Sequence, residues 1–297
     1  MDSYIAHVKR ARTLIRRHEF RVKKKLGQHF MVSPRVLQRI IELAEIQPED
    51  RVLEIGPGLG ALTQFLAEKA QQVVAVEIDT TLLPLLRETL AGYPQVQVVQ
   101  GDILQVNLDE VMQAAKGSTL EVNSQYKVVG NLPYYITSPI VMKVLEGGYQ
   151  IGNLVMLVQK EVAQRMAAKP ATKEYGLLSV AVQFYAEVYC GGEVPRDAFW
   201  PQPEVESALV KLVPRKEPPV KVIDRPFFFW VARAAFGQRR KTLLNALVGA
   251  PGPFKLNREE VESHLVNLNI DPRRRGETLN LAELAEVSNR LYPILGI

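Results

Sequence analysis

The sequence predicts an α/β domain with a mostly parallel sheet, followed by a small domain made only of helices. Apolar strand-like segments alternate with helix-like segments from residue 51 to about residue 160. Helical segments of about ten residues between strands form crossover connections, which produce parallel strands with helices on both faces of the sheet. Prolines and charges replace this pattern at 214–219, and the later apolar segments have helical periodicity. We therefore expect a basic N-terminal arm (1–25), an α/β domain (26–214) and a helical domain (220–297).

Each expected element has its own local signal. Apolar runs bounded by glycine, asparagine or charged residues are typical of buried strands, whereas longer periodic segments are typical of helices. The expected strands are 51–55, 73–78, 96–99, 126–129 and 153–158, with further short strands between 181 and 213 that include 207–213. The expected helices are 61–70, 80–90 and 159–168, and in the C-terminal domain 227–236, 241–248, 258–267 and 281–291.

The composition is that of an ordinary globular protein. The 297 residues are 47% hydrophobic and 23% charged, enough for one large domain and a smaller one. We expect no membrane contact, because no apolar run approaches the roughly 20 residues of a membrane helix. The single cysteine, Cys190, excludes an intramolecular disulfide and fits a reducing, cytoplasmic environment. The four histidines lack metal-ligand spacing, so we expect no metal site.

Clustered basic residues indicate a polyanionic partner. The net charge is +5, but nine basic residues fall between residues 9 and 25 beside a single acid. Further clusters occur at Arg239–Lys241 and Arg273–Arg275. Nucleic acid suits such clusters, because its phosphates release counterions on binding. The alternatives are a solvated helix face and, for the N-terminal run, a transit peptide, which the absence of a cleavage-like break before residues 26–30 disfavours.

A glycine-rich loop at Glu54–Gly60 follows the first strand and opens a helix, which is the usual position of a cofactor loop. Gly56 and Gly58 let the backbone turn sharply and approach a ligand without interference from a side chain. The Gly-x-Gly-x-x-Ala pattern across 56–61 also fits a nicotinamide dehydrogenase. The loop alone therefore leaves open the choice between a nicotinamide and an adenosyl cofactor.

Polar side chains follow the next three strands at their carboxyl ends. Glu77 suits the ribose hydroxyls of either cofactor, whereas Asp102 suits the amino group of a cofactor adenine. Asn131, after the fourth strand, would then face the transferable group. The carboxyl ends of parallel strands meet at one edge of a sheet, so these groups should share one crevice. The combination favours S-adenosylmethionine, although any one of these acids alone could be a helix cap.

The segment Asn131-Leu-Pro-Tyr134 provides the groups needed to hold a planar base by its exocyclic amino group. The amide oxygen of Asn131 and the carbonyl oxygen of Leu132 can each accept one amino hydrogen. Pro133 removes a competing backbone donor and favours an extended Leu132. Tyr134 offers a ring for stacking, worth roughly 1–3 kcal/mol per base. The alternative is a strand followed by an ordinary turn containing Asn and Pro.

Seven motifs occur in an order that resembles a known family. They are Leu26-Gly-Gln-His-Phe-Met31, Glu54–Gly60, Gly101-Asp102, Gly130–Tyr134, Phe199-Trp-Pro-Gln-Pro203, Glu206-Ser-Ala-Leu-Val210 and Phe236–Asn245. With these motifs the chain resembles, over nearly its whole length, the ribosomal RNA adenine dimethyltransferases, in particular their bacterial small-subunit branch. The resemblance implies a Rossmann-like class I methyltransferase domain that uses S-adenosylmethionine. It also implies cofactor contacts from His29, Met31, Gly56, Glu77, Asp102 and Asn131.

Two of these residues depart from the family's pattern, because His29 replaces the usual Asn and Met31 the usual Leu.

The implied reaction is dimethylation of the exocyclic amino groups of two adjacent adenosines. The implied substrate is the 3′-terminal hairpin loop of small-subunit (16S) ribosomal RNA, within the small ribosomal subunit or its precursor, so the protein would contribute to ribosome biogenesis. We expect a monomer, since no long exposed heptad suggests pairing.

The adenine must be looped or flipped out, because a base inside a duplex cannot reach such a crevice. Tyr134 would stack on one face of it, and Phe199 is the candidate for the other face. Core packing is an equally supported alternative for Phe199. Arg239, Arg240 and Lys241 are expected to contact RNA phosphates, and the alternative is that they extend over apolar neighbours and pair with acids.

Three other functions compete with this interpretation. Large-subunit rRNA dimethyltransferases of the antibiotic-resistance type usually have Ile in place of Leu132 and lack the 237–241 segment in this form. A ribosome-assembly or transcription factor that only binds would be expected to have lost Glu77, Asp102 or Asn131, all of which this sequence retains. A nicotinamide dehydrogenase is the third alternative.

Overall fold

The computed structural model describes residues 4–115, 125–238 and 240–295. Within it the chain divides into two compact units. The first unit comprises Met1–Ala163 and Val188–Pro214, and the second comprises Gln164–Glu187 and Arg215–Ile297. One junction thus lies beside the proline-rich stretch at 214–219. Residues 164–187 belong to the second unit because side chains such as Phe184 are buried in the same apolar cluster as the C-terminal helices.

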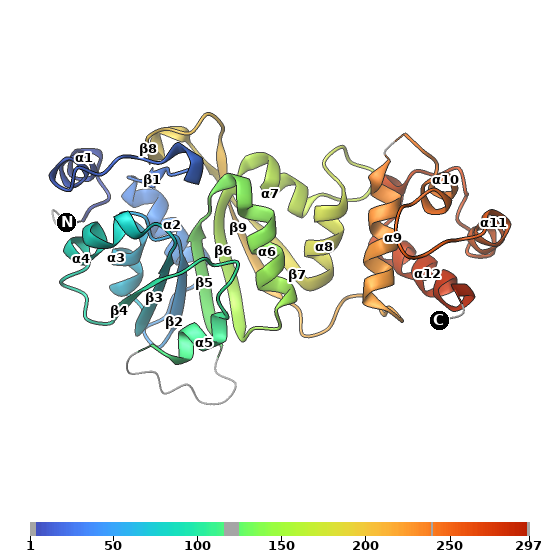
Figure 1. Ribbon diagram of the computed structural model, residues 1–297, viewed down its shortest axis with the longest axis horizontal. Coiled ribbons are helices and arrows are strands. Elements are labelled where there is room, and N and C mark those ends of the chain that lie inside the picture. Colours follow the sequence, from blue (N-terminus) through green and yellow to red (C-terminus); the bar gives the residue numbers. More distant parts are fainter. Residues whose placement is uncertain (1–3, 116–124, 239, 296–297) are drawn as a thin grey trace. The chain divides into compact units, whose positions relative to one another are not determined.

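A seven-stranded sheet forms the centre of the first unit (Figure 1). Its strands, in spatial order, are β4 (Val96–Gln100), β3 (Gln72–Glu77), β2 (Arg51–Ile55), β5 (Tyr126–Asn131), β6 (Ile151–Gln159), β9 (Ser207–Pro214) and β7 (Ala186–Val194). The first five strands run parallel, and β9 pairs antiparallel with β6. A separate antiparallel pair consists of β1 (Phe30–Met31) and β8 (Phe199–Trp200). The predicted α/β class with a mostly parallel sheet is confirmed.

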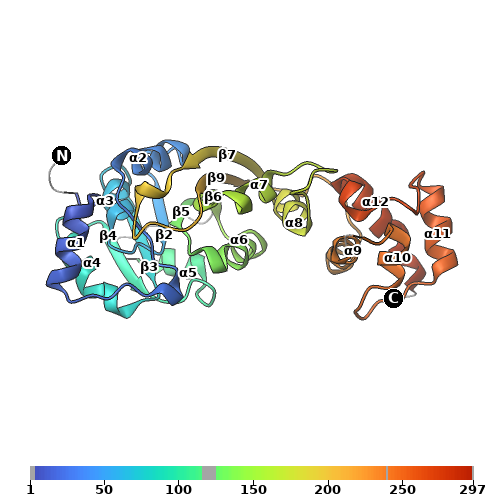
Figure 2. The same ribbon diagram turned by 90° about the horizontal axis from the view of Figure 1, so that it is seen from above.

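Helices flank both faces of this sheet, and Figure 2 shows α2 and α6 on opposite faces. The α-helices are α1 (Val8–Arg17), α2 (Pro34–Leu43), α3 (Ala61–Ala67), α4 (Leu83–Thr89), α5 (Leu108–Gln113), α6 (Thr137–Glu146) and α7 (Lys160–Ala167), and the short 3-10 turns are η1 (Lys24–Leu26), η2 (Thr80–Leu82), η3 (Tyr134–Ile136) and η4 (Arg196–Ala198). The helix predicted at 80–90 is divided into η2 and α4. Proline near the start of α4 suits a helix beginning there, since its missing N–H is not needed in the first turn.

The second unit is helical, as predicted for the C-terminal region. Its elements are α8 (Leu177–Tyr185), α9 (Arg225–Gly237), α10 (Leu243–Val248), α11 (Arg258–Asn267), η5 (Gly276–Thr278), α12 (Leu281–Leu291) and η6 (Tyr292–Leu295). Asparagine and aspartate caps begin the longer helices; the Asp224 carboxylate, for example, accepts a 2.7 Å hydrogen bond from the backbone N–H of Phe227. Strand was wrongly predicted for residues 181–185, which form the end of α8 and bury apolar side chains among aromatic rings of α9.

Strand register brings several carboxyl ends to one edge of the sheet. Ile55 of β2 lies opposite Val76 of β3 on one side and Gly130 of β5 on the other. Glu77 and Asn131 are therefore the last residues of strands that flank the glycine loop. The strands β2, β3 and β5 are largely buried, and their register sets the position of the loop side chains at their carboxyl ends.

Candidate active site

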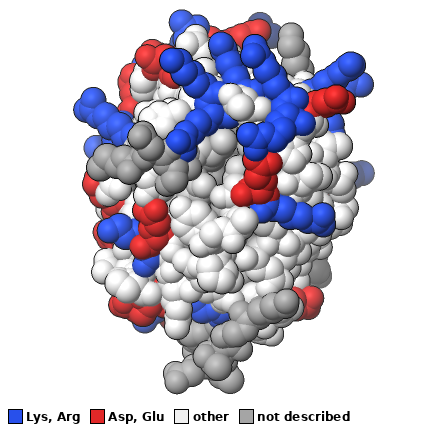
Figure 3. All heavy atoms as spheres, turned by 90° about the vertical axis from the view of Figure 1, so that its left-hand side faces the viewer, with Lys and Arg blue, Asp and Glu red and all other residues white. Residues whose placement is uncertain are grey.

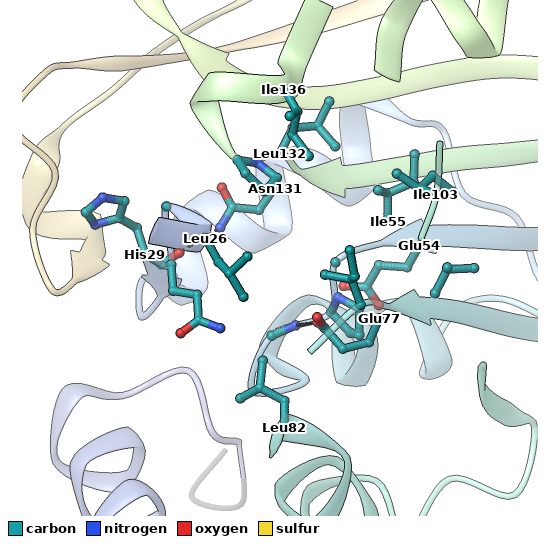
Figure 4. A pocket seen from close by; sticks show the side chains of 18 of the residues that line it. Leu26, His29, Glu54, Ile55, Glu77, Leu82, Ile103, Asn131, Leu132 and Ile136 are labelled. Atoms are coloured by element: carbon teal, nitrogen blue, oxygen red, sulfur yellow. Dashed lines mark hydrogen bonds between the residues drawn. The ribbon is translucent and has the colours of Figure 1, made fainter. Parts of the chain in front are cut away.

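One cavity opens at this edge of the sheet, and Glu77, Asp102 and Asn131 all line it. Its wall also includes the glycine loop, the segment Leu26–Met31 and the segment Asn131–Ile136. Figure 4 shows side chains from these separate strands and loops converging on the same space. The sequence placed these three polar groups in one crevice, and the structure brings them together.

The glycine loop has the conformation that its residues allow. Gly56 and Gly58 have positive φ angles of 69° and 59°, which side-chain-bearing residues rarely adopt. A Cβ on Gly56 would meet nothing within 4 Å, whereas one on Gly58 would lie 3.1 Å from the Phe30 ring. Gly56 therefore leaves open space on the cavity side, and Gly58 lets the loop pack closely against β1.

Glu77 is oriented by backbone groups. Its carboxylate accepts hydrogen bonds from the N–H of Asp79 at 2.8 Å and from the N–H of Gly58 at 3.3 Å. Burial raises the pKa of Glu77, and these two hydrogen bonds oppose the rise. A carboxylate fixed in this way at a strand end can accept two further hydrogen bonds from a pair of vicinal hydroxyls.

Glu54 is a cavity residue to which sequence reasoning gave no role. Its side chain is buried, lines the cavity, and has one oxygen, Oε2, with no hydrogen-bond partner among the described residues. Burial raises the pKa of Glu54 to about 8; the nearby Thr63 hydroxyl opposes the rise, and the Glu77 carboxylate adds to it. In the sequence, the only feature that could have drawn attention to Glu54 was its position as a single acid inside an otherwise apolar buried strand. An unsatisfied buried carboxylate facing a cavity is suited to a cationic or hydrogen-donating ligand group.

Asp102 combines a turn with its place in the cavity wall. One carboxylate oxygen accepts a 2.9 Å hydrogen bond from the N–H of Leu104, and the backbone carbonyl accepts one from Gln105 at 2.8 Å. Asp102 therefore closes a local turn and is not a helix cap, because the next helix, α5, begins at Leu108 with Asn107 as its N-cap. This turn does not remove Asp102 from the cavity wall, where its half-buried side chain remains.

The amide orientation of Asn131 follows from one hydrogen bond. Its Nδ2 donates to the backbone carbonyl of His29 at 2.9 Å. With the nitrogen engaged there, Oδ1 is left as the acceptor of the amide group. In Figure 4 this side chain projects into the cavity from the end of β5. That the Asn131 oxygen accepts a hydrogen from an amino group stays a prediction.

The residues after Asn131 are held by a tight turn. Pro133 has φ −58° and ψ 130°, and its carbonyl accepts hydrogen bonds from Ile136 at 3.2 Å and Thr137 at 3.1 Å. The Leu132 side chain is buried, which anchors the turn to the core. The half-buried Tyr134 lines the cavity, and its hydroxyl lies 2.6 Å from Ser207 Oγ. Burial raises the pKa of Tyr134, so this phenol stays neutral.

His29 and Met31 lie where the cavity meets the β1–β8 pair. The His29 ring nitrogen Nδ1 is 2.7 Å from the carbonyl oxygen of Pro201, and Figure 4 shows the ring directed away from the cavity. The imidazole also stacks on Tyr134 with ring centroids 5.9 Å apart. The backbone of His29 is thus its cavity-facing part. Met31 is buried and lines the cavity wall.

Phe199 does not occupy the position expected of a base-stacking residue. It pairs with Met31 in the β1–β8 ladder, is 2% exposed, and belongs to the buried apolar core. It is not among the residues that line the cavity. The structure therefore corrects the stacking expectation in favour of core packing. A different aromatic residue, Tyr135, lines the cavity with 59% of its surface exposed, and sequence reasoning gave it no role.

Exposed basic side chains gather on the N-terminal arm. The buried face of α1 consists of Ala11, Leu14 and Ile15, so its cations point outward. Figure 3 draws one side of the first unit, and Lys and Arg side chains are concentrated along one part of that surface. The exposed basic residues of this arm include Lys9, Arg10, Arg12, Arg16 and Arg21.

The predicted basic cluster in the second unit is described only in part. Arg240 and Lys241 are exposed between α9 and α10, whereas Arg239 lies outside the described residues. Within the described part of the chain, no helix is long and apolar enough to cross a membrane. The same residues contain no group of three or more His, Cys, Asp or Glu side chains that could hold a metal ion.

The fold and the cavity together define a Rossmann-like methyltransferase. Residues 19–286 match the family described as "Ribosomal RNA adenine dimethylase", and the chain belongs to this family. Ribosomal RNA small subunit methyltransferase A of Geobacillus kaustophilus is 48% identical over 292 residues, covering 98% of each chain. The protein of the same name from Bacillus cytotoxicus is 47% identical over 289 residues, covering 97% of this chain and 98% of that one.

Solved structures show the same architecture. A dimethyladenosine transferase from Plasmodium falciparum matches with a TM-score of 0.70 and 25% identity, covering 87% of this chain and 96% of that one. The 23S rRNA methyltransferase ErmE matches with a TM-score of 0.65 and 29% identity, covering 89% of this chain and 99% of that one. The resemblance inferred from seven motifs is thus confirmed at the level of the family.

Proposed function

We propose that this protein dimethylates the exocyclic amino groups of two adjacent adenosines in the 3′-terminal hairpin loop of 16S ribosomal RNA. The observation that carries the proposal is the Asn131 amide. Its nitrogen is engaged by His29, and its oxygen remains as an acceptor in a cavity that also contains Glu77 and Asp102. The full-length similarity to small-subunit methyltransferases supports the choice of RNA.

The cavity residues fit S-adenosylmethionine. Glu77 would hold the ribose hydroxyls and Asp102 the adenine amino group, while Gly56 leaves open space beside them. The unpartnered Oε2 of Glu54 would face the positively charged part of the molecule. His29 and Met31 would contribute backbone and packing contacts. When bound, this cofactor supplies an electrophilic methyl group on a sulfonium.

The residues of the Asn131–Tyr134 segment would activate and position the adenine. Asn131 Oδ1 and the Leu132 carbonyl accept the two amino hydrogens, which draws the nitrogen toward tetrahedral geometry and frees its lone pair for attack. Tyr134 holds the base by stacking. Positioning of this kind can supply up to roughly 7–11 kcal/mol. The methylated nitrogen then loses one proton to water. Only one amino hydrogen remains after this first methylation, so one acceptor must be dispensable in the second round.

The RNA surface would include the exposed cations of α1 and those around Arg240 and Lys241. We propose that the protein acts in the bacterial cytoplasm, on the small ribosomal subunit or its precursor, and as a monomer. Large-subunit RNA is the second candidate substrate, because ErmE shares the fold. Leu132 and the lower identity to ErmE than to the small-subunit relatives favour the 16S substrate.

One experiment separates these candidates. Purified protein is incubated with labelled S-adenosylmethionine and either unmethylated small-subunit particles or large-subunit particles, with Asn131→Ala as the matched inactive control. We expect dimethyladenosine only in the small-subunit RNA and only with the wild type. Label in large-subunit RNA would favour the second candidate. Particle binding without any label would instead indicate an assembly factor.

A further inference from the structure

The Asp79 carboxylate accepts hydrogen bonds from three residues that lie in two separate segments of the first unit. Its side chain is 1% exposed and forms an ion pair with Lys23 Nζ at 2.6 Å. Gln28 Nε2 donates to its other oxygen at 2.7 Å, and Thr81 donates through its hydroxyl at 2.6 Å and its backbone N–H at 3.0 Å. Burial alone would raise the pKa of Asp79, but these hydrogen bonds hold it below its ordinary value, so the group stays ionised.

Capping of a local turn explains only part of this arrangement. Asp79 is the N-cap of η2, and the bonds from Thr81 satisfy that role. Lys23 and Gln28 lie more than 50 residues away in sequence, and neither is needed to cap η2. A buried carboxylate that draws a lysine and an amide from a distant segment holds that segment in place.

The segment it holds forms one wall of the cavity. Residues 26–31 line the cavity, and the backbone carbonyl of His29, next to Gln28, accepts the Asn131 hydrogen bond. On its other side, the Asp79 backbone N–H donates to Glu77 at 2.8 Å. A continuous set of contacts therefore runs from Glu77 through Asp79 and residues 28–29 to Asn131, around the cavity.

We propose that Asp79 is a positioning residue for methyl transfer, whose carboxylate docks residues 23–31 against the cavity and thereby keeps the Asn131 amide oriented toward the adenine. This inference rests on the proposed function. Lys23 accordingly serves the cavity wall and is not one of the RNA-binding cations of the arm. Asp79 itself is not among the residues that line the cavity.

Asp79→Asn tests this role, because it keeps the shape of the side chain while removing its charge. Lys23 and Gln28 donate to different oxygens of Asp79, and an amide group has only one oxygen, so the asparagine loses one of these two acceptors. The matched control is Asp50→Asn, which also breaks a 2.6 Å ion pair, with Lys127, but at a site that does not line the cavity. Gln28→Leu is a second variant, in case Asp79→Asn folds poorly. It keeps both partners of the Lys23–Asp79 ion pair and removes the two hydrogen bonds of the Gln28 amide, which donates to Asp79 and accepts from the Lys23 backbone N–H.

Three measurements distinguish positioning from general stabilisation. With saturating S-adenosylmethionine and small-subunit particles, we expect kcat to fall at least about tenfold in Asp79→Asn and in Gln28→Leu, but not in Asp50→Asn, since bonds to charged groups are of that strength. Trypsin should cut near Lys23 faster in Asp79→Asn than in Asp50→Asn. Lys23→Met combined with Asp79→Asn should lose little more than Asp79→Asn alone, because both changes break one linkage.

The outcomes separate this inference from the function on which it rests. Equal kcat and equal trypsin cleavage in Asp79→Asn and Asp50→Asn, with an active wild type, would overturn the positioning role alone. Lower thermal stability without a change in kcat would likewise reduce Asp79 to a structural residue. A wild-type protein that methylates no particle would instead overturn the proposed function, and that failure would appear before any variant is compared.

Discussion

Glu54→Gln should make the stability of the free protein less sensitive to pH. In the folded protein the pKa of Glu54 is about 8, compared with an ordinary value of 4.5 in the unfolded chain. Between these two values the folded state retains a proton that the unfolded state has lost. Stability is therefore lost as pH rises from about 4.5 to about 8, and the loss is complete above that pH. Glutamine has nearly the same shape and does not ionise, so this contribution disappears.

The structure sets the scale of the effect. One pKa unit corresponds to about 1.4 kcal/mol, so the rise from 4.5 to about 8 limits the cost of ionised Glu54 to about 5 kcal/mol. Local rearrangement and water entry reduce such a cost, and we expect about 1–3 kcal/mol at pH 8.5. The raised pKa of Glu77 acts in the same direction in both proteins and largely cancels in the comparison.

Thermal unfolding of both proteins without cofactor at pH 5.5, 6.5, 7.5 and 8.5 measures this effect. The melting temperature of Glu54→Gln relative to the wild type should rise steadily across the series. The affinity of Glu54→Gln for S-adenosylmethionine, relative to that of the wild type, should fall across the same series. The reason is that the wild type gains an ionised acceptor as pH rises and the variant does not. A difference in melting temperature that stays constant from pH 5.5 to 8.5 would refute the reasoning, since Glu54 would then titrate at its ordinary value.

Three further outcomes test the site and the RNA surface. Asn131→Ala should abolish methylation with little change in thermal unfolding, and near-wild-type turnover would remove Asn131 from the reaction. Glu77→Ala should weaken S-adenosylmethionine binding in calorimetry more than RNA binding, by about 1.5–3 kcal/mol per ribose hydrogen bond lost; unchanged affinity would contradict the assignment. Changing Arg240 and Lys241 to Gln should reduce the salt dependence of RNA binding by up to about 0.7–0.9 log units per phosphate contact, whereas cofactor affinity should stay the same.

The sequence predicted the sheet and the meeting of three polar side chains for one physical reason. Runs rich in valine that end in a polar residue or a turn mark the carboxyl ends of strands, both in the buried strands β3 and β5 and in the partly exposed edge strand β4. Glu77, Asp102 and Asn131 could therefore be placed at one edge without coordinates. The motif around Asn131 identified the chemistry because its residue types, and not their tertiary contacts, carry the acceptors.

Packing of single side chains could not be predicted in the same way. Phe199 lies within a motif segment and Tyr135 directly after one, yet the first aromatic residue is 2% and the second 59% exposed. Phe199 lies in strand β8, which pairs with β1 and so joins residues about 170 positions apart in the sequence. This long-range pairing could not be foreseen from the local sequence. Glu54 was similarly given no role, because its significance lies in a missing hydrogen-bond partner, and a missing partner can be recognised only when all its neighbours are known.

The basic arm shows how charge counted along a sequence differs from charge available to a ligand. All nine cations of residues 9–25 contribute equally to the sequence-based prediction of a nucleic-acid surface. In the structure Arg17 pairs with Glu88, and Lys23 pairs with Asp79 next to the segments that line the cavity. Each of these two cations would have to give up an acid before it could bind a phosphate. The salt dependence of RNA binding should therefore be set by the exposed, outward-facing cations of α1, and replacing Lys23 should alter catalysis more than it alters that slope.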